Sequence, residues 1–199
     1  MHRATQAQQP TTEWFSMLIQ TEATPNPNTL KFLPGQPVVS GPPRDFKTAQ
    51  EAEASPLARK LFALDGVSGV FMGSDFISVS KVAEADWALL KPAILGVIME
   101  HYLSGEPIIE GDAAEAKEFY DEKDAEVVQR IKEVLDTRVR PAVAQDGGDI
   151  TFQGFKDGVV YLQMVGACSG CPSSTATLKQ GVENLLRHFV PQVEEVQQV

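Results

Sequence analysis

Cysteine is scarce in this chain: the 199 residues include two cysteines, and both belong to one Cys-x-x-Cys motif, Cys168 and Cys171. Two cysteines this close together exclude the long-range disulfide framework of a small secreted domain. The two thiols are therefore expected to serve chemistry or metal binding in a reducing compartment. Histidine is almost as scarce, and none of His2, His101 and His188 lies near the motif in sequence.

Long hydrophobic runs are also missing. The longest apolar region, residues 87–102, is interrupted by Lys91, Glu100 and His101. It therefore falls short of the roughly 18 apolar residues of a transmembrane helix. We expect no membrane-spanning segment.

The N-terminus has few of the features of a targeting signal. Residues 2–12 lack an apolar segment and contain a single arginine among glutamines and threonines. They are a poor match to a secretion signal and to a mitochondrial one. We expect residues 1–16 to form a disordered extension, with Met17 as an alternative first residue. The expected location is the bacterial cytoplasm, ahead of the mitochondrial matrix.

Basic residues are fewer than acidic ones. The chain has 17 Lys and Arg residues against 27 Asp and Glu residues, and its formal net charge is -10. A general nucleic-acid binder needs a basic face that displaces counterions from phosphates. An anionic membrane surface likewise attracts basic segments. Neither nucleic acid nor a membrane is an expected partner.

The first predicted domain covers residues 17–104. Ser55 is suited to cap a helix, and Pro56 suits the first helical position. Two runs that are rich in β-branched and aromatic residues, 67–72 and 76–81, flank a Gly-Ser-Asp turn and predict a hairpin. A second helix is expected over about residues 85–103, with its apolar side chains on one stripe. These are Trp87, Leu90, Ile94, Val97, Ile98 and His101.

An acidic segment, residues 105–122, follows the first domain, with Lys117 as its one basic residue. Such a run is typical of a solvated linker. An acidic docking site is the alternative interpretation.

The second predicted domain covers residues 123–199 and has an α-β-β-α order. An Asp-Gly pair at Asp157 is a tight hairpin signal between its two strands. The Cys-x-x-Cys motif then occupies the loop between the second strand and the last helix. We therefore predict an α+β protein of two small domains. The expected elements are helix 124–139, strands 149–155 and 159–165, and helix 172–189, with a further edge strand after Pro191.

The predicted position of the motif explains what its thiols can do. Cys171 falls near the start of a helix, where free backbone N–H groups and the positive end of the helix dipole favour the thiolate. The thiolate is the form that binds metal. Gly166 and Gly170 allow the backbone to approach a bulky group, and Ser173 and Ser174 can add hydroxyl donors.

Three interpretations of the motif follow from the residues. A Cys₄ zinc site or an ordinary iron–sulfur cluster needs four ligands, and one chain supplies two thiolates. Two chains related by a two-fold axis complete such a site most simply. A thiol–disulfide oxidoreductase in which Cys168 attacks is the second interpretation, although its motif usually lies early in a βαβ unit. A buried, inert pair of cysteines is the third.

A resemblance narrows this choice. Residues 166–183, GACSGCPSSTATLKQGVE, resemble the signature of the NifU-type C-terminal domain, as do residues 140–150, RPAVAQDGGDI. Residues 21–35, TEATPNPNTLKFLPG, and residues 56–81 are similar to the N-terminal domain of Nfu-type proteins. The likeness covers nearly all of the chain from Met17 onward and leaves out residues 1–16 and the acidic segment.

The resemblance implies a specific function. Members of the family bind a [4Fe–4S] cluster between two subunits and hand it to apo-enzymes, and their cluster ligands correspond to Cys168 and Cys171. Expected partners are a second copy of the chain, an upstream cluster donor and apo iron–sulfur targets. Zinc at the same dimeric site is a variant that the sequence leaves open. No catalytic triad, phosphate loop or paired catalytic carboxylate is recognisable, so we do not expect an enzyme. Asp146 and Asp149 are assigned to turn chemistry, with a supporting role beside the cysteine loop as the alternative.

Overall fold

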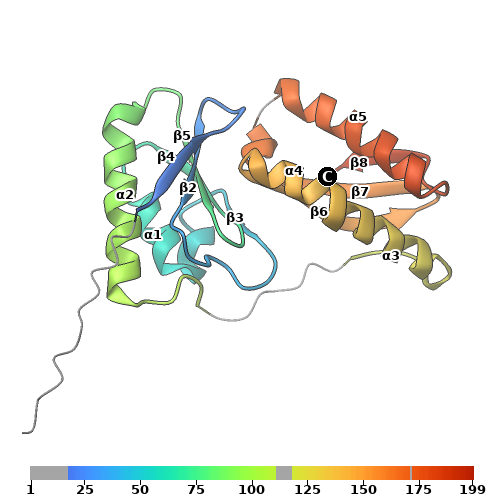
Figure 1. The fold of residues 1–199 in the computed structure, drawn as a ribbon, viewed down its shortest axis with the longest axis horizontal. Coiled ribbons are helices and arrows are strands. Elements are labelled where there is room, and N and C mark those ends of the chain that lie inside the picture. The colour runs from blue at the N-terminus through green and yellow to red at the C-terminus, as the bar shows by residue number, and fades with distance from the viewer. Residues whose placement is uncertain (1–17, 111–117, 171) are drawn as a thin grey trace, which may run out of the picture.

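The computed structural model describes residues 18–110, 118–170 and 172–199, which form two α+β domains (Figure 1). The expected fold class is confirmed. The predictions for residues 1–16 and for Cys171 lie outside the described residues. The N-terminal domain has strands β1 (Gln20–Ala23), β2 (Thr29–Leu33), β3 (Arg44–Phe46), β4 (Val67–Met72) and β5 (Ile77–Lys81), a 3-10 turn (Glu51–Ala54), and helices α1 (Pro56–Phe62) and α2 (Trp87–Ser104).

The five strands of the N-terminal domain form one antiparallel sheet in the order β1-β2-β5-β4-β3. Helix α1 begins as the sequence predicts, because the hydroxyl of Ser55 accepts a hydrogen bond of 3.1 Å from the N–H of Ala58 and Pro56 fills the first helical position. Strand β3 was not expected. It lies in the Pro- and Gly-rich segment and joins the sheet by pairing with β4.

Helix α2 packs one face on the sheet. Leu90, Ile94, Ile98 and His101 are buried there, as the predicted stripe requires. The opposite face is also apolar, and Leu89 and Leu103 are 79% and 77% exposed. Within the described part of the chain, no helix is long and apolar enough to cross a membrane.

The C-terminal domain places two strands and a third, parallel one against its helices. Its elements are α3 (Ala125–Val134), a π-helical turn (Leu135–Val139), α4 (Arg140–Gln145), β6 (Gly148–Lys156), β7 (Val159–Gly166), α5 (Pro172–Phe189) and β8 (Glu195–Gln198). Strands β6 and β7 form the expected hairpin, turning at Asp157 and Gly158 with φ of 49° and 79°. The edge strand expected after Pro191 is β8, which pairs parallel to β7.

The first helix of this domain differs from the prediction. It was expected to end near Val139, but the helical path continues through a π-helical turn and α4 to Gln145. Pro141 lacks an N–H and cannot continue a regular α-helical ladder in mid-helix. The wider turn before it, and its place in the first turn of α4, accommodate this defect.

The acidic segment is anchored at both ends, contrary to a fully solvated linker. Ile108 and Ile109 pack on the N-terminal core, and the hydroxyl of Ser55 donates a hydrogen bond of 2.6 Å to the carbonyl of Ile108. At the other end, Phe119 bridges to Gly154 of β6 and stacks its ring 5.1 Å from that of Tyr161. Apolar side chains at the borders of the charged run explain the difference, because they bury area on both domains.

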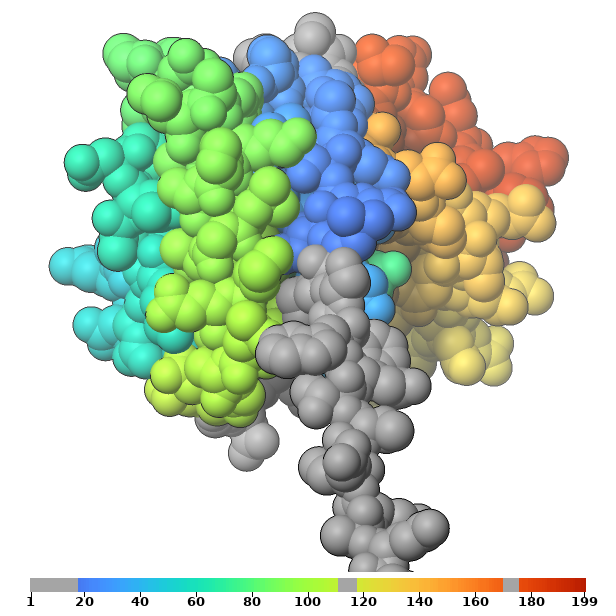
Figure 2. Space-filling model, turned by 60° about the vertical axis from the view of Figure 1, so that its left-hand side comes forward, coloured from blue at the N-terminus to red at the C-terminus, as the bar shows by residue number. Residues whose placement is uncertain are grey.

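The two domains contact each other through the sheet. Helices α1 and α2 cover one face of the N-terminal sheet, and the C-terminal domain lies against the other (Figure 1). The space-filling view shows the strands of residues 18–33 (blue) between α2 (green) and the C-terminal domain (orange) (Figure 2). Phe71, Phe76 and Val165 form a small buried cluster at this contact. The contact lies directly beside the predicted cysteine loop.

Candidate metal-binding loop

The cysteine loop connects β7 to α5, as predicted. Strand β7 ends at Gly166, a 3-10 turn spans Ala167–Gly170, and α5 begins at Pro172. Cys168 lies in this turn and is 7% exposed. The hydroxyl of Ser169 donates a hydrogen bond of 2.9 Å to the carbonyl of Gly166, which closes the turn. Cys171 lies outside the described residues, so its position as a ligand stays a prediction.

Gly148 provides the space in which Cys168 sits. It is the first residue of β6 and pairs with Gly166 across the hairpin. A Cβ atom at Gly148 would lie 2.7 Å from Sγ of Cys168 and 2.6 Å from the carbonyl oxygen of Val165. Both distances are too short for a real side chain, so only glycine allows the sulfur to approach the strand this closely. Gly148 is therefore part of the thiol's surroundings.

An ion pair fixes the start of β6. The guanidinium of Arg140 donates from Nε to Oδ1 of Asp149 at 2.9 Å and from Nη2 to Oδ2 at 2.6 Å. Its Nη1 donates to Asp136 at 3.0 Å. The hydrogen bond to Asp149 is the largest of the effects that raise the pKa of Arg140 above its usual value. This bidentate pair ties α4 to the strand on which Cys168 rests.

The two aspartates around the glycine pair therefore have different roles. Asp146 is exposed and its N–H bonds to the carbonyl of Val143, which is the turn chemistry assigned to it. Asp149 is buried, accepts a hydrogen bond of 2.7 Å from the N–H of Ile150, and pairs with Arg140. Its assignment to turn chemistry is wrong, because the fold brings Arg140 to it from the preceding helix. A bidentate Arg–Asp pair nine residues apart has no signature in a single sequence.

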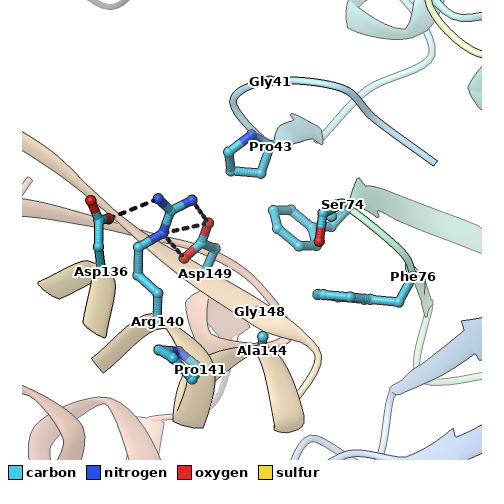
Figure 3. A pocket seen from close by; sticks show the side chains of 12 residues that line it. Gly41, Pro43, Ser74, Phe76, Asp136, Arg140, Pro141, Ala144, Gly148 and Asp149 are labelled. Atoms are coloured by element: carbon cyan, nitrogen blue, oxygen red, sulfur yellow. Dashed lines mark hydrogen bonds and ion pairs between the residues drawn. The ribbon is translucent and has the colours of Figure 1, made fainter. Parts of the chain in front are cut away.

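A cavity of about 250 Å³ opens between the two domains next to Gly148 (Figure 3). Arg140 and Asp149 of the C-terminal domain line one side of it, and Pro43 and Phe76 of the N-terminal domain line the other (Figure 3). The Arg140 guanidinium is already bonded to Asp136 and Asp149. With its polar groups satisfied by one another, the cavity is better described as a gap between the packed domains than as a ligand site.

The described residues fit a sulfur-bound metal group better than a nitrogen- or oxygen-bound one. Thiolates select zinc and iron–sulfur clusters. Within the described ranges, no group of three or more His, Cys, Asp and Glu side chains is placed to hold a metal ion. His101 lies on α2 of the other domain, and His188 is exposed near the end of α5. Of the described residues, the structure therefore brings neither of these histidines to the motif.

The fold and the loop define a two-domain protein with a cysteine motif on a strand-to-helix loop. Two family models match the two domains: "Scaffold protein Nfu/NifU N terminal" over residues 19–105 and "NifU-like domain" over residues 131–197. The human "NFU1 iron-sulfur cluster scaffold homolog, mitochondrial" is 51% identical over 184 residues, which cover 92% of this chain and 72% of that protein. The chain therefore belongs to the Nfu family of iron–sulfur cluster scaffold homologues.

Other relatives agree with this assignment. The protein of the same name from Drosophila erecta is 51% identical over 185 residues, 92% of this chain. The chain spans 65% of the length of that relative. The solution structure of a NifU-like protein from Saccharomyces cerevisiae covers 56% of this chain at 25% identity, with a TM-score of 0.46. That structural similarity is too low to add to the argument.

The expected bacterial cytoplasmic location is wrong. Relatives that share half of their residues with this chain are named mitochondrial, which points to the mitochondrion instead. The error has a physical cause. Charge and cysteine content are properties of the folded domains. A compartment is specified by targeting segments, and the composition of the folded domains does not depend on such segments.

Proposed function

We propose that this protein carries an iron–sulfur cluster as cargo, bound as [4Fe–4S] between two copies of the chain, and transfers it to apo-proteins. The observation that supports this proposal is Cys168 in a tight turn between Gly166 and the start of α5, in a Cys-x-x-Cys sequence whose second cysteine is Cys171. Two thiolates per chain are half of the four that an ordinary cluster requires. A two-fold pair of loops supplies the other half.

The proposed arrangement suits transfer better than storage. A cluster that is held between two subunits is released when the subunits separate, without unfolding either one. The 18-residue helix α5 begins directly after the motif, so its unpaired N–H groups lie on the loop side of the helix. They favour the negative charge of thiolates and of an anionic cluster.

The same proposal assigns the protein no catalytic reaction. Its partners are a second copy of the chain when cargo is bound, an upstream donor that supplies the cluster, and apo iron–sulfur proteins that receive it. The names of the relatives support a scaffold role for this family. Cargo type, sharing and transfer are proposals for this chain.

Anaerobic reconstitution with iron and sulfide tests the proposal. Iron and acid-labile sulfide are measured per chain together with native mass, and about four of each per dimer are expected. Cys168→Ser and Cys171→Ser are each expected to abolish cluster binding while circular dichroism stays unchanged. Ser40→Ala, at an exposed position outside the loop, is the control and is expected to retain the cluster.

Two alternative outcomes would redirect the assignment. One zinc per dimer, bound in preference to iron and lost in both cysteine variants, would identify a structural site of the same geometry. A monomer that binds no iron but forms a reversible Cys168–Cys171 disulfide and exchanges it with other thiols would identify an oxidoreductase. Full cluster occupancy in either single cysteine variant would contradict the ligand assignment itself.

A further inference from the structure

A row of side chains crosses the N-terminal sheet on the face that carries no helix. Strand register places Asp45 opposite Phe71, Phe71 opposite Ser78, and Ser78 opposite Lys31. Phe71 and Ser78 are 2% and 1% exposed, although α1 and α2 cover the other face of the sheet (Figure 1). The C-terminal domain buries them, so the row is the contact surface between the domains.

The row meets two glycines of the C-terminal domain through their backbone atoms. The hydroxyl of Ser78 donates a buried hydrogen bond of 2.6 Å to the carbonyl of Gly147. Next to this bond, Phe71 packs so closely on Gly166, whose φ is +68°, that a Cβ there would lie 2.9 Å from Cγ of Phe71. One donor of the sheet is thus matched to an acceptor of the first glycine, and an aromatic ring occupies the space that a side chain on the second would need.

The glycine pair connects this contact to the cysteine loop. The carbonyl of Gly147, which accepts the Ser78 hydroxyl, also accepts a hydrogen bond of 3.2 Å from the N–H of Ala167. Ala167 directly precedes Cys168 and begins the turn that holds it. Gly166, on which Phe71 packs, is the last residue of β7 before that turn. The sheet therefore contacts both the carbonyl that anchors the cysteine turn and the residue that leads into it.

Burial makes the hydrogen bond between Ser78 and Gly147 specific to the observed packing of the two domains. The hydroxyl of Ser78 and the carbonyl of Gly147 form a buried hydrogen bond. A hydroxyl or carbonyl that loses its partner in such a site leaves a buried polar group unsatisfied, which costs more than the net gain of forming the bond. Hence Ser78 favours one position of the glycine pair over displaced ones.

We propose that Ser78 is a positioning residue for the cysteine loop, so that the N-terminal domain holds the turn around Cys168 in its ligand-binding conformation. A ligand that is held in place before its cargo arrives binds that cargo more tightly than a mobile one. The part of this inference that concerns cargo rests on the function proposed above. The part that concerns the loop stands on the contacts alone.

Hydrogen exchange in the full-length, reduced, cluster-free protein tests the inference. Ser78→Ala is compared with Ser80→Ala, which removes a hydroxyl from the same face of the same strand but one that bonds to Thr29 inside the N-terminal domain. Exchange at the Ala167 amide and alkylation of the thiols by N-ethylmaleimide are measured. Ser78→Ala is expected to speed both about fivefold, the factor for one net hydrogen bond. Ser80→Ala is expected to match the wild type.

A change confined to the N-terminal domain would not reach an amide in the C-terminal one, so this measurement separates positioning from simple destabilisation. Equal exchange at Ala167 in both serine variants and the wild type would overturn the proposal.

A second experiment tests the effect on the cluster. It uses reconstituted protein and follows loss of the cluster to a chelator by absorbance. Ser78→Ala is expected to shorten the half-life of the cluster about fivefold and Ser80→Ala to leave it unchanged. If no cluster binds to the wild type, the proposed function fails, while the exchange data still decide the positioning role. If the cluster binds and its half-life and the exchange rates are the same in all variants, the positioning role fails and the proposed function survives.

Discussion

Oγ of Ser78 lies 2.6 Å from the carbonyl oxygen of Gly147, a residue 69 positions further along the chain. This hydrogen bond is buried and joins the sheet of the N-terminal domain to the residue that also holds the N–H of Ala167. The cysteine loop and the N-terminal sheet therefore form one continuous hydrogen-bonded structure. Removal of the Ser78–Gly147 hydrogen bond is therefore expected to affect the cysteine loop.

Gly148→Ala is predicted to displace Cys168. The new methyl group would lie 2.7 Å from Sγ of Cys168 and 2.6 Å from a carbonyl oxygen, so the strand or the turn must move. Overpacking of this kind costs ~1–3 kcal/mol of unfolding free energy. Chemical denaturation measures the cost, and iron content after reconstitution measures the effect on the site.

The matched control for that change is Gly181→Ala in α5, where a Cβ meets nothing within 4 Å. Alanine at a helix interior is expected to raise the unfolding free energy by ~0.5–1 kcal/mol. Equal stability effects in the two variants would contradict the close contact at Gly148.

Arg140→Ala is predicted to destabilise the C-terminal domain by about 2 kcal/mol, because it leaves the buried carboxylate of Asp149 without its bidentate partner. Arg140 is itself partly exposed, so the cost is smaller than for a fully buried pair. Urea denaturation measures the effect. Arg130→Ala, at an exposed position of α3, is the control and is expected to stay within about 0.5 kcal/mol of the wild type.

Acidification is predicted to lower the unfolding free energy, because protonation of His101 is disfavoured in the folded protein. Its ring is fully buried, and burial lowers its pKa below 6.5, with Lys60 lowering it further and Glu106 opposing. The unfolded chain therefore takes up a proton before the folded one. The contribution of His101 is complete above pH 6.5 and is lost as the pH falls towards the lowered pKa, with a slope of at most ~1.4 kcal/mol per pH unit.

Denaturation of wild type and His101→Leu between about pH 7.5 and 5.5 tests this linkage. The variant is expected to lose the part of the pH dependence that histidine causes. Identical slopes for the two proteins would show that the acid sensitivity arises from other groups.

Ser55→Ala is predicted to lower the unfolding free energy of the N-terminal domain by ~1–2 kcal/mol. The hydroxyl accepts from the N–H of Ala58 at 3.1 Å and donates to the carbonyl of Ile108 at 2.6 Å, so one substitution removes a helix cap and the anchor of the acidic segment. Limited proteolysis after Ile108 is expected to accelerate. Ser40→Ala, at an exposed position, is the control and is expected to change neither measurement.

Local patterns in the sequence predicted the elements that depend on local chemistry. Ser55 and Pro56 marked the start of α1, Asp157-Gly158 marked the β6–β7 turn, and the motif was placed between β7 and α5. These signals work because a cap, a positive φ and a helix start are decided within a few residues. Strand β3 was missed because three residues carry too little periodicity and their pairing with β4 is non-local.

The same division holds for the site. The sequence alone placed the Cys-x-x-Cys motif between a strand and a helix, because the patterns that mark these elements are local. That a bound group takes further ligands from a second chain is a prediction from the number of cysteines. Only the tertiary structure decided that Arg140 pairs with Asp149, that Gly148 makes room for the sulfur, and that Ser78 reaches Gly147. Each of these contacts depends on how helices, strands and domains pack. The identity of a serine or a glycine in the sequence does not show which distant residue the fold brings next to it.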